Sequence, residues 1–91
     1  MEFEWDENKN KSNLEKHGID FNDAKEVFKD GNRTNSEDNR YDYGEKRWIT
    51  IGKMYKAIIV VVYTIRDATR IISARMANKK ERKSYNNEEN N

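Results

Sequence analysis

Two arginines in the second half of the chain, Arg66 and Arg75, have the side-chain type best suited to bind phosphate. Arg75 follows residues 71–74, whose character suits a sheet interior, so a permanent charge stands where a core residue is expected. A guanidinium is a planar fork that can hold two phosphate oxygens at once. The alternative is that Arg75 pairs with a carboxylate such as Asp6 or Glu7 and serves only the fold.

The charge is divided unevenly along the 91 residues. Residues 1–45 carry seven Lys and Arg against thirteen Asp and Glu, whereas residues 46–91 carry eleven against four. The net charge of +1 therefore hides an acidic half and a basic half. A basic half favours a polyanionic partner, either nucleic acid or an acidic protein. In the other interpretation the two halves neutralise each other across the fold.

Length and composition limit what else the chain can be. We expect one thin-cored domain over residues 1–85 and a disordered tail at 86–91, because 91 residues with 34% hydrophobic and 38% charged content cannot build two cores. The lack of Cys excludes disulfides and Cys-based zinc sites, and a single His argues against a His-based site, so we expect no metal and no cofactor. The sequence has neither an apolar run of membrane-spanning length nor the pattern of a signal peptide, which predicts a cytoplasmic protein without a membrane partner.

The acidic half is predicted to be helical. Asp6 is a suitable N-cap for a first helix that runs to about His17, with Gly18 as a left-handed stop. Three apolar residues are expected to dock this helix: Trp5, Leu14 and Phe21. A second helix is predicted to start at Asp20 or Asn22 and to end at Gly31, with an apolar stripe of Ala24, Val27 and Phe28.

The basic half is predicted to be a sheet. Alternation in 47–52 and the β-branched runs in 57–65 and 69–75 indicate three strands in an antiparallel meander, with tight connections at 54–57 and 66–68. A short edge strand near 33–36 would make four, and Asn78 is a suitable N-cap for a short basic helix to about residue 85. The fold class is therefore α+β, with two N-terminal helices packed on a sheet of three to four strands.

Strand alternation gives Arg75 a predicted neighbourhood. It places Arg75 on one face with Ser73 and Ile71. The opposite face would carry Arg70, Ile72, Ala74 and Met76. If the acidic helices cover one face, the other is left to the basic residues, and such a face would suit a phosphodiester chain.

Three separated blocks of the sequence resemble the BrnT toxins of bacterial type II toxin–antitoxin modules. The blocks are FEWDENKNKSNLEKHGIDFNDAKEVF, RWITIG and YTIRDATRIISARMANKKERKSY, which cover about residues 2–85. The resemblance implies a RelE-like fold, a ribonuclease that arrests translation, and neutralisation by a BrnA-like, DNA-binding antitoxin in a hetero-oligomeric complex. The chain departs from the family pattern after Phe28, where Gly31 stands in place of a common Pro, and at residues 76–78, where a basic residue and a Thr or Ser are common.

The chemistry that the resemblance implies is metal-independent endoribonuclease cleavage, with the RNA 2′-hydroxyl as the nucleophile. This reaction needs a proton acceptor, cations for the crowded phosphorus centre and help for the leaving 5′-oxygen. The candidate catalytic residues are Arg66, Arg75 and His17. The candidate RNA-binding residues are Arg47, Trp48, Lys53, Lys79 and Arg82.

Several alternatives stay open at the sequence level. His17 can be a helix-end cap, and a Glu, a Lys or one of Tyr63 and Tyr85 can carry the proton in its place. Trp5 and Trp48 can stack on bases or pack in the core. The whole chain can also be a non-catalytic module that grips nucleic acid or an antitoxin by charge alone.

Overall fold

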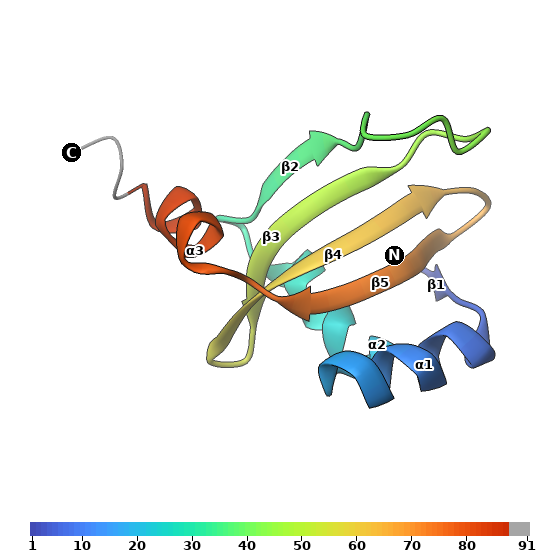
Figure 1. Ribbon diagram of the computed structural model, residues 1–91, viewed down its shortest axis with the longest axis horizontal. Helices are drawn as coiled ribbons and strands as arrows, with labels where there is room; N and C mark the ends of the chain where they lie inside the picture. Colours follow the sequence, from blue (N-terminus) through green and yellow to red (C-terminus); the bar gives the residue numbers. More distant parts are fainter. Residues whose placement is uncertain (88–91) are drawn as a thin grey trace.

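The computed structural model describes residues 1–87 and is an α+β fold (Figure 1). Its elements are β1 (Phe3–Glu4), α1 (Glu7–His17), α2 (Phe21–Ala24), the 3-10 helix η1 (Lys25–Lys29), β2 (Thr34–Glu37), β3 (Trp48–Met54), β4 (Ala57–Ile65), β5 (Thr69–Met76) and α3 (Lys79–Asn86). Of the segment 86–91, which was predicted as a tail, Asn86 is the last residue of α3 and Asn87 is its left-handed C-cap. The rest of that segment lies outside the described residues.

Within the described chain the strands form one sheet in the order β1-β5-β4-β3-β2. The predicted antiparallel meander is confirmed for β3, β4 and β5, and the predicted edge strand is β2, paired antiparallel to β3. A fifth strand was missed: β1 pairs parallel to β5 through Phe3 with Thr69 and Glu4 with Arg70. Two residues are too few to show strand alternation in a sequence.

The helices α2 and η1 lie against one face of the sheet, which we call the helix face, and α1 runs beside the edge of β5 (Figure 1). The core consists of buried side chains from both layers: Ile19, Phe21, Ala24, Val27, Ile59, Val61, Ile71 and Ala74. Gly52 lets η1 approach β3 closely, because a Cβ on it would lie 3.0 Å from Val27 Cγ1. The opposite side of the sheet is called the outer face.

A β-bulge in β5 changes which face each residue occupies. Val62 pairs with Ser73 and Tyr63 pairs with Ile71, so Ile72 is an extra residue on β5. Ile71 therefore joins the helix face, while Ser73 stays on the outer face. The prediction that Ile71 shares a face with Arg75 was wrong, because strict alternation cannot anticipate an inserted residue.

The predicted limits of α1 are confirmed, but its docking differs from the prediction. Asp6 caps its first turn, and Gly18 ends it with φ 71°. Leu14 is 46% exposed and does not dock the helix. The buried residue is Asn13, whose Nδ2 donates to the carbonyls of Ile19 and Ala74, both at 2.9 Å, and whose Oδ1 accepts from the Ala74 N–H at 3.1 Å.

The other helix limits follow from local caps. Asp20, one of the two predicted starts, is the N-cap of α2. The helical segment ends earlier than predicted, because η1 stops at Lys29 and its C-cap is Asp30, not Gly31. Asn78 caps α3 in a capping box with Glu81. None of the helices within residues 1–87 is long and apolar enough to cross a membrane.

Candidate functional site

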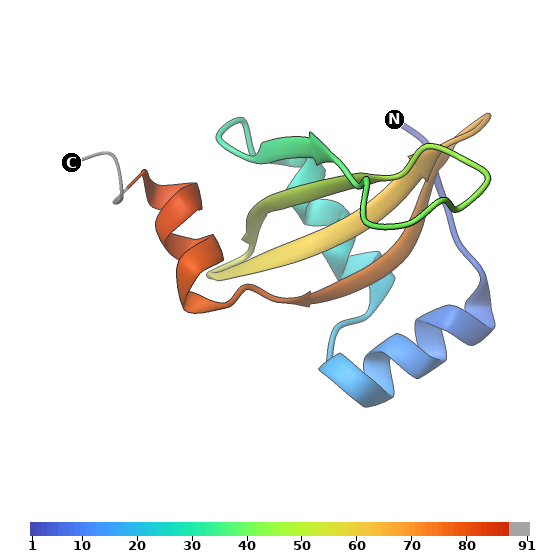
Figure 2. The ribbon, with the colours of Figure 1, turned by 45° about the horizontal axis from the view of Figure 1, so that its top comes forward.

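A cavity of about 380 Å³ lies on the outer face of the sheet. Its floor is apolar, made by Ile49, Val60 and Val62. Its rim is polar and charged: Arg40, Ser73, Arg75 and Glu81. Figure 1 shows α3 at one end of the sheet and the loop between β2 and β3 toward the other, and in Figure 2 this loop passes in front of the sheet. We call this site the outer-face cavity.

Arg75 is held at the rim by the first turn of α3. Its Nη1 and Nη2 donate to Glu81 Oε1 at 2.8 Å and to Oε2 at 2.7 Å. These hydrogen bonds hold the pKa of Glu81 below its usual value, so the carboxylate is charged at neutral pH. The alternative that Arg75 pairs with a carboxylate is therefore confirmed, but the partner is Glu81 and not Asp6 or Glu7.

Arg40 reaches the same cavity from the loop between β2 and β3. Its Nε and Nη2 donate to the buried carboxylate of Asp38 at 2.8 and 2.9 Å, and Tyr43 Oη donates to the same group at 3.0 Å. The bonds from Arg40 hold the pKa of Asp38 far below its usual range. Bonds to Glu81 raise the pKa of Arg75, and the positive charge of Arg40 opposes that shift, so the two guanidiniums are electrostatic neighbours.

Three residues of this site were not predicted from the sequence: Arg40, Asp38 and Glu81. Arg40 and Asp38 lie in a polar stretch without periodicity, where a charge normally indicates solvent exposure, and Glu81 is one acidic residue in a basic segment. The only available signal was the Asp-x-Arg spacing, which is too common to select a site.

The predicted residues Arg66 and Arg47 form a second cluster where β3 begins and β4 ends. Glu45 accepts from Arg66 Nη2 at 3.0 Å and from Arg47 Nε at 3.2 Å. The hydrogen bond from Arg66 lowers the pKa of Glu45. The guanidinium of Arg47 also stacks over Tyr43, 4.0 Å from the ring centroid. Since Tyr43 contacts Asp38 as well, one loop connects this cluster to the outer-face cavity.

The remaining RNA-binding candidates lie in different places. Trp48 pairs across from Tyr63, which is buried on the helix face, so Trp48 does not line the outer-face cavity. Lys53 stands across from Ile58 on the outer face. Lys79 begins α3, and Arg82 in the same helix donates to the carbonyl of Ala77 at 2.8 Å.

The two tyrosines considered as proton carriers both have structural hydrogen bonds. Tyr85 Oη donates to Asp30 Oδ2 at 2.6 Å, which raises the pKa of Tyr85 to about 12 and ties α3 to the end of η1. Tyr63 Oη donates to Asn35 Oδ1 at 2.6 Å and links β4 to β2.

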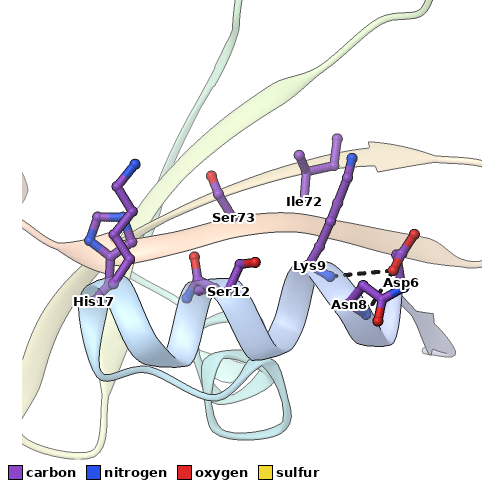
Figure 3. A pocket seen from close by; sticks show the side chains of 9 residues that line it. Asp6, Asn8, Lys9, Ser12, His17, Ile72 and Ser73 are labelled. Carbon is purple, nitrogen blue, oxygen red and sulfur yellow. Dashed lines mark hydrogen bonds between the residues drawn. The ribbon is translucent and has the colours of Figure 1, made fainter.

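His17 does not meet the arginines of either cluster. It lines a separate groove between α1 and β5 together with Lys9, Ser12 and Lys16 (Figure 3). The structure therefore separates the three predicted catalytic residues: Arg75 at the outer-face cavity, Arg66 beside Arg47, and His17 in the groove. Among residues 1–87 no group of three or more His, Cys, Asp or Glu side chains is placed to hold a metal ion.

Two guanidiniums and a hydroxyl at the rim of one cavity can bind the anionic oxygens of a phosphodiester, and a charged carboxylate beside them can accept a proton. The fold and this cavity define a small α+β domain with an arginine-lined cavity on the outer face of its sheet. Residues 5–81 match the family described as "Ribonuclease toxin, BrnT, of type II toxin-antitoxin system", and the chain belongs to that family. Membership implies an RNA target and an antitoxin partner. No curated protein matches the chain.

Proposed function

We propose that the protein is a RelE-like endoribonuclease toxin that cleaves RNA at the outer-face cavity without a metal ion and thereby inhibits translation in the cytoplasm. The observation that carries the proposal is the convergence of Arg75, Arg40 and Glu81 on one cavity. Family membership supplies the RNA target.

The ion pair of Arg75 and Glu81 supplies both an anion-binding group and a base. A phosphate that enters the cavity competes with Glu81 for the guanidinium fork. When the fork moves to the phosphate, the main cause of the lowered pKa of Glu81 is removed, and its carboxylate becomes the stronger base.

The reaction is then a transfer of phosphorus between two oxygens. Glu81 takes the proton of the 2′-hydroxyl, the 2′-oxygen bonds to phosphorus, and the bond from phosphorus to the 5′-oxygen breaks. The leaving oxygen takes a proton from water, and the hydroxide that remains takes the proton from Glu81, which restores both groups. Arg75 and Arg40 stabilise the charge that develops on the phosphate oxygens. The products are a 2′,3′-cyclic phosphate and a 5′-hydroxyl.

The rest of the basic half would bind RNA on either side of the reacting phosphate. Arg47 and Arg66 lie at one end of the sheet, and Lys53, Lys79 and Arg82 lie near α3 at the other. Base stacking by Trp48 is not part of the proposal, because its strand pairing places it on the helix face. We further propose that a BrnA-like antitoxin with its own DNA-binding region covers the outer face.

The test is incubation of purified protein with labelled single-stranded RNA in EDTA, beside an Arg75→Ala variant and an RNA with 2′-deoxy residues. We expect the wild type to cleave RNA in EDTA, the variant to be impaired, and the 2′-deoxy substrate to resist. Cleavage that requires added Mg²⁺ would overturn the metal-independent mechanism. RNA binding without any cleavage would favour the non-catalytic module instead.

A further inference from the structure

A groove of about 360 Å³ lies between α1 and the edge of β5 (Figure 3). Its wall on the helix side carries Lys9, Ser12, Lys16 and His17, and its wall on the sheet side carries Ile72 and Ser73. We call it the α1–β5 groove. It belongs to neither arginine cluster.

The groove exists because a helix, not a strand, continues beside β5. The strand β1 pairs only with Thr69 and Arg70. Beyond that point, the amide of Asn13 satisfies both backbone groups of Ala74. A helix held at one residue by a side-chain amide leaves more space beside the strand than a paired strand would, and this space is the groove.

The groove is locally basic although it lies in the acidic half of the sequence. Lys9 and Lys16 are two turns apart on one side of α1, about 10 Å along the helix axis. Neither lysine has an ion-pair partner among residues 1–87. The one acidic side chain in the lining, Asp6, is occupied, because its Oδ1 accepts the backbone N–H groups of Asn8 at 2.8 Å and of Lys9 at 3.3 Å (Figure 3).

The groove and the outer-face cavity share one lining residue. Ser73 lines both spaces and stands two residues from Arg75 on β5. An extended anionic chain held at Arg75 can therefore cross the β5 edge at Ser73 and continue along the lysines of α1. Positive grooves that follow a nucleic-acid backbone have this arrangement.

We infer that the α1–β5 groove is a second RNA subsite, which binds the single strand beyond the reacting phosphate, with Lys9 and Lys16 on backbone phosphates and with Ser12 and His17 as further hydrogen-bonding groups. This inference rests on the proposed function, since it extends the same bound strand. It gives His17 a role in binding and explains why His17 lies away from Arg75.

The test uses two 2′-O-methyl RNA oligomers, which cannot be attacked by their own 2′-oxygen, of about 4 and about 12 nucleotides, lengths within the range of known single-strand sites. Binding is measured by fluorescence anisotropy at several salt concentrations. The variant is Lys9→Gln with Lys16→Gln. The control is Lys11→Gln with Lys56→Gln, which removes the same charge from exposed lysines outside the groove lining.

We expect the wild type to bind the longer oligomer more tightly and the groove variant to lose most of that gain. For two lost phosphate contacts on a single strand, the slope of log K against log salt should shrink by about 1.4. The control should keep both the gain and the slope. Circular dichroism and thermal melting would verify that each variant is folded.

Equal losses in the groove variant and the control would overturn the inference, because a general positive field would then explain binding. Loss of antitoxin binding with unchanged RNA binding would also overturn it and assign the groove to the antitoxin. These outcomes differ from failure of the proposed function, in which the wild type cleaves no RNA of any length.

Discussion

In the proposed mechanism the guanidinium of Arg75 has two competing partners, the carboxylate of Glu81 and the phosphate of a substrate. Its side chain is 40% exposed and that of Glu81 is 21% exposed. An ion pair this accessible contributes only about 0–1 kcal/mol to stability, so its exchange for a phosphate costs the fold little. A fully buried pair could not be opened at so low a cost. The exposure of the pair therefore suits a group that changes partner during a reaction.

Replacement of Glu81 by Gln separates its possible roles. Glutamine can still accept the N–H of Asn78 and close the capping box of α3, but it cannot take a proton. We expect Glu81→Gln to lower the cleavage rate by about 100-fold or more, the usual contribution of a general base. Its melting temperature should stay near that of the wild type. A rate close to that of the wild type would remove Glu81 from the mechanism.

Asp38 should control how stability depends on pH. Its pKa in the folded protein lies well below the value of about 4 in an unfolded chain, because of Arg40. The stabilisation is therefore complete above pH 4 and is lost as the pH falls further, when the unfolded state binds the proton first.

Urea midpoints measured between pH 3 and 7 check this prediction. Asp38→Asn should be less stable than the wild type at pH 7, with a smaller further loss on acidification. Some acid dependence should remain, because Asp30, Glu45 and Glu81 also have lowered pKa values. Parallel curves for the two proteins would contradict the account of Asp38.

At the scale of elements, α1 is attached to the sheet by amide hydrogen bonds more than by apolar contacts. Asn13 bonds the backbone of Ala74 and Ile19, and Asn10 Oδ1 accepts from the N–H of Phe21 at 2.8 Å. Polar anchoring of this kind explains how a helix with one aliphatic residue, Leu14, can have a fixed position.

Asn13→Ala should destabilise the protein strongly, whereas Leu14→Ala should not. The first change leaves buried backbone groups of Ala74 and Ile19 without partners, at a cost of about 2 kcal/mol or more. The second removes an exposed side chain and should change the free energy of unfolding by less than about 0.5 kcal/mol. Urea unfolding of both variants measures the difference. The reverse order would restore Leu14 as the docking residue.

Features with local chemical causes could be predicted from the sequence, and features with non-local causes could not. The caps at Asp6 and Asn78 and the stop at Gly18 depend on neighbouring residues alone, and all three are confirmed. The bulge at Ile72 arises from pairing between strands, and no residue type in β5 indicates it in the sequence.

The candidate site follows the same division. Arg75 was found because a charge in an apolar strand is a local anomaly. Arg40 was not found, because its importance depends on a loop that folds over the sheet and on a buried partner, Asp38, two residues away. The separation of His17 from Arg75 could likewise be seen only once the two residues were placed in the folded structure.

For the whole molecule, mutual neutralisation accounts for part of the basic half, and the rest stays available to a polyanionic partner. Glu45 neutralises Arg47 and Arg66, and Glu4 neutralises Arg70 with an Nη1 to Oε2 distance of 2.9 Å, so acidic and basic halves do pair across the fold. Several lysines of the basic half have no ion-pair partner among the described residues: Lys46, Lys53, Lys56, Lys79, Lys80 and Lys83. The positive field available to a partner therefore comes mainly from lysines.

Antitoxin binding should reflect this field. We expect the segment that contacts the outer face to be acidic and the association rate to fall steeply between about 0.05 and 0.5 M salt, because exposed charges are screened over this range. Stopped-flow association of toxin and antitoxin measures the rate. An association rate independent of salt would refute electrostatic recognition of the outer face.

The central claim is that Arg75 clamps the reacting phosphate. Its most direct test is to measure the single-turnover rate of RNA cleavage in EDTA for the Arg75→Lys variant. The Arg66→Lys variant and the wild type are measured beside it. Lysine keeps the charge and removes the fork. We predict a rate for Arg75→Lys at least about tenfold below that of the wild type, equivalent to about 1.4 kcal/mol, with an unchanged melting temperature, and a smaller effect for Arg66→Lys. Normal cleavage by Arg75→Lys, or a loss of melting temperature with normal cleavage by the folded fraction, would contradict the claim.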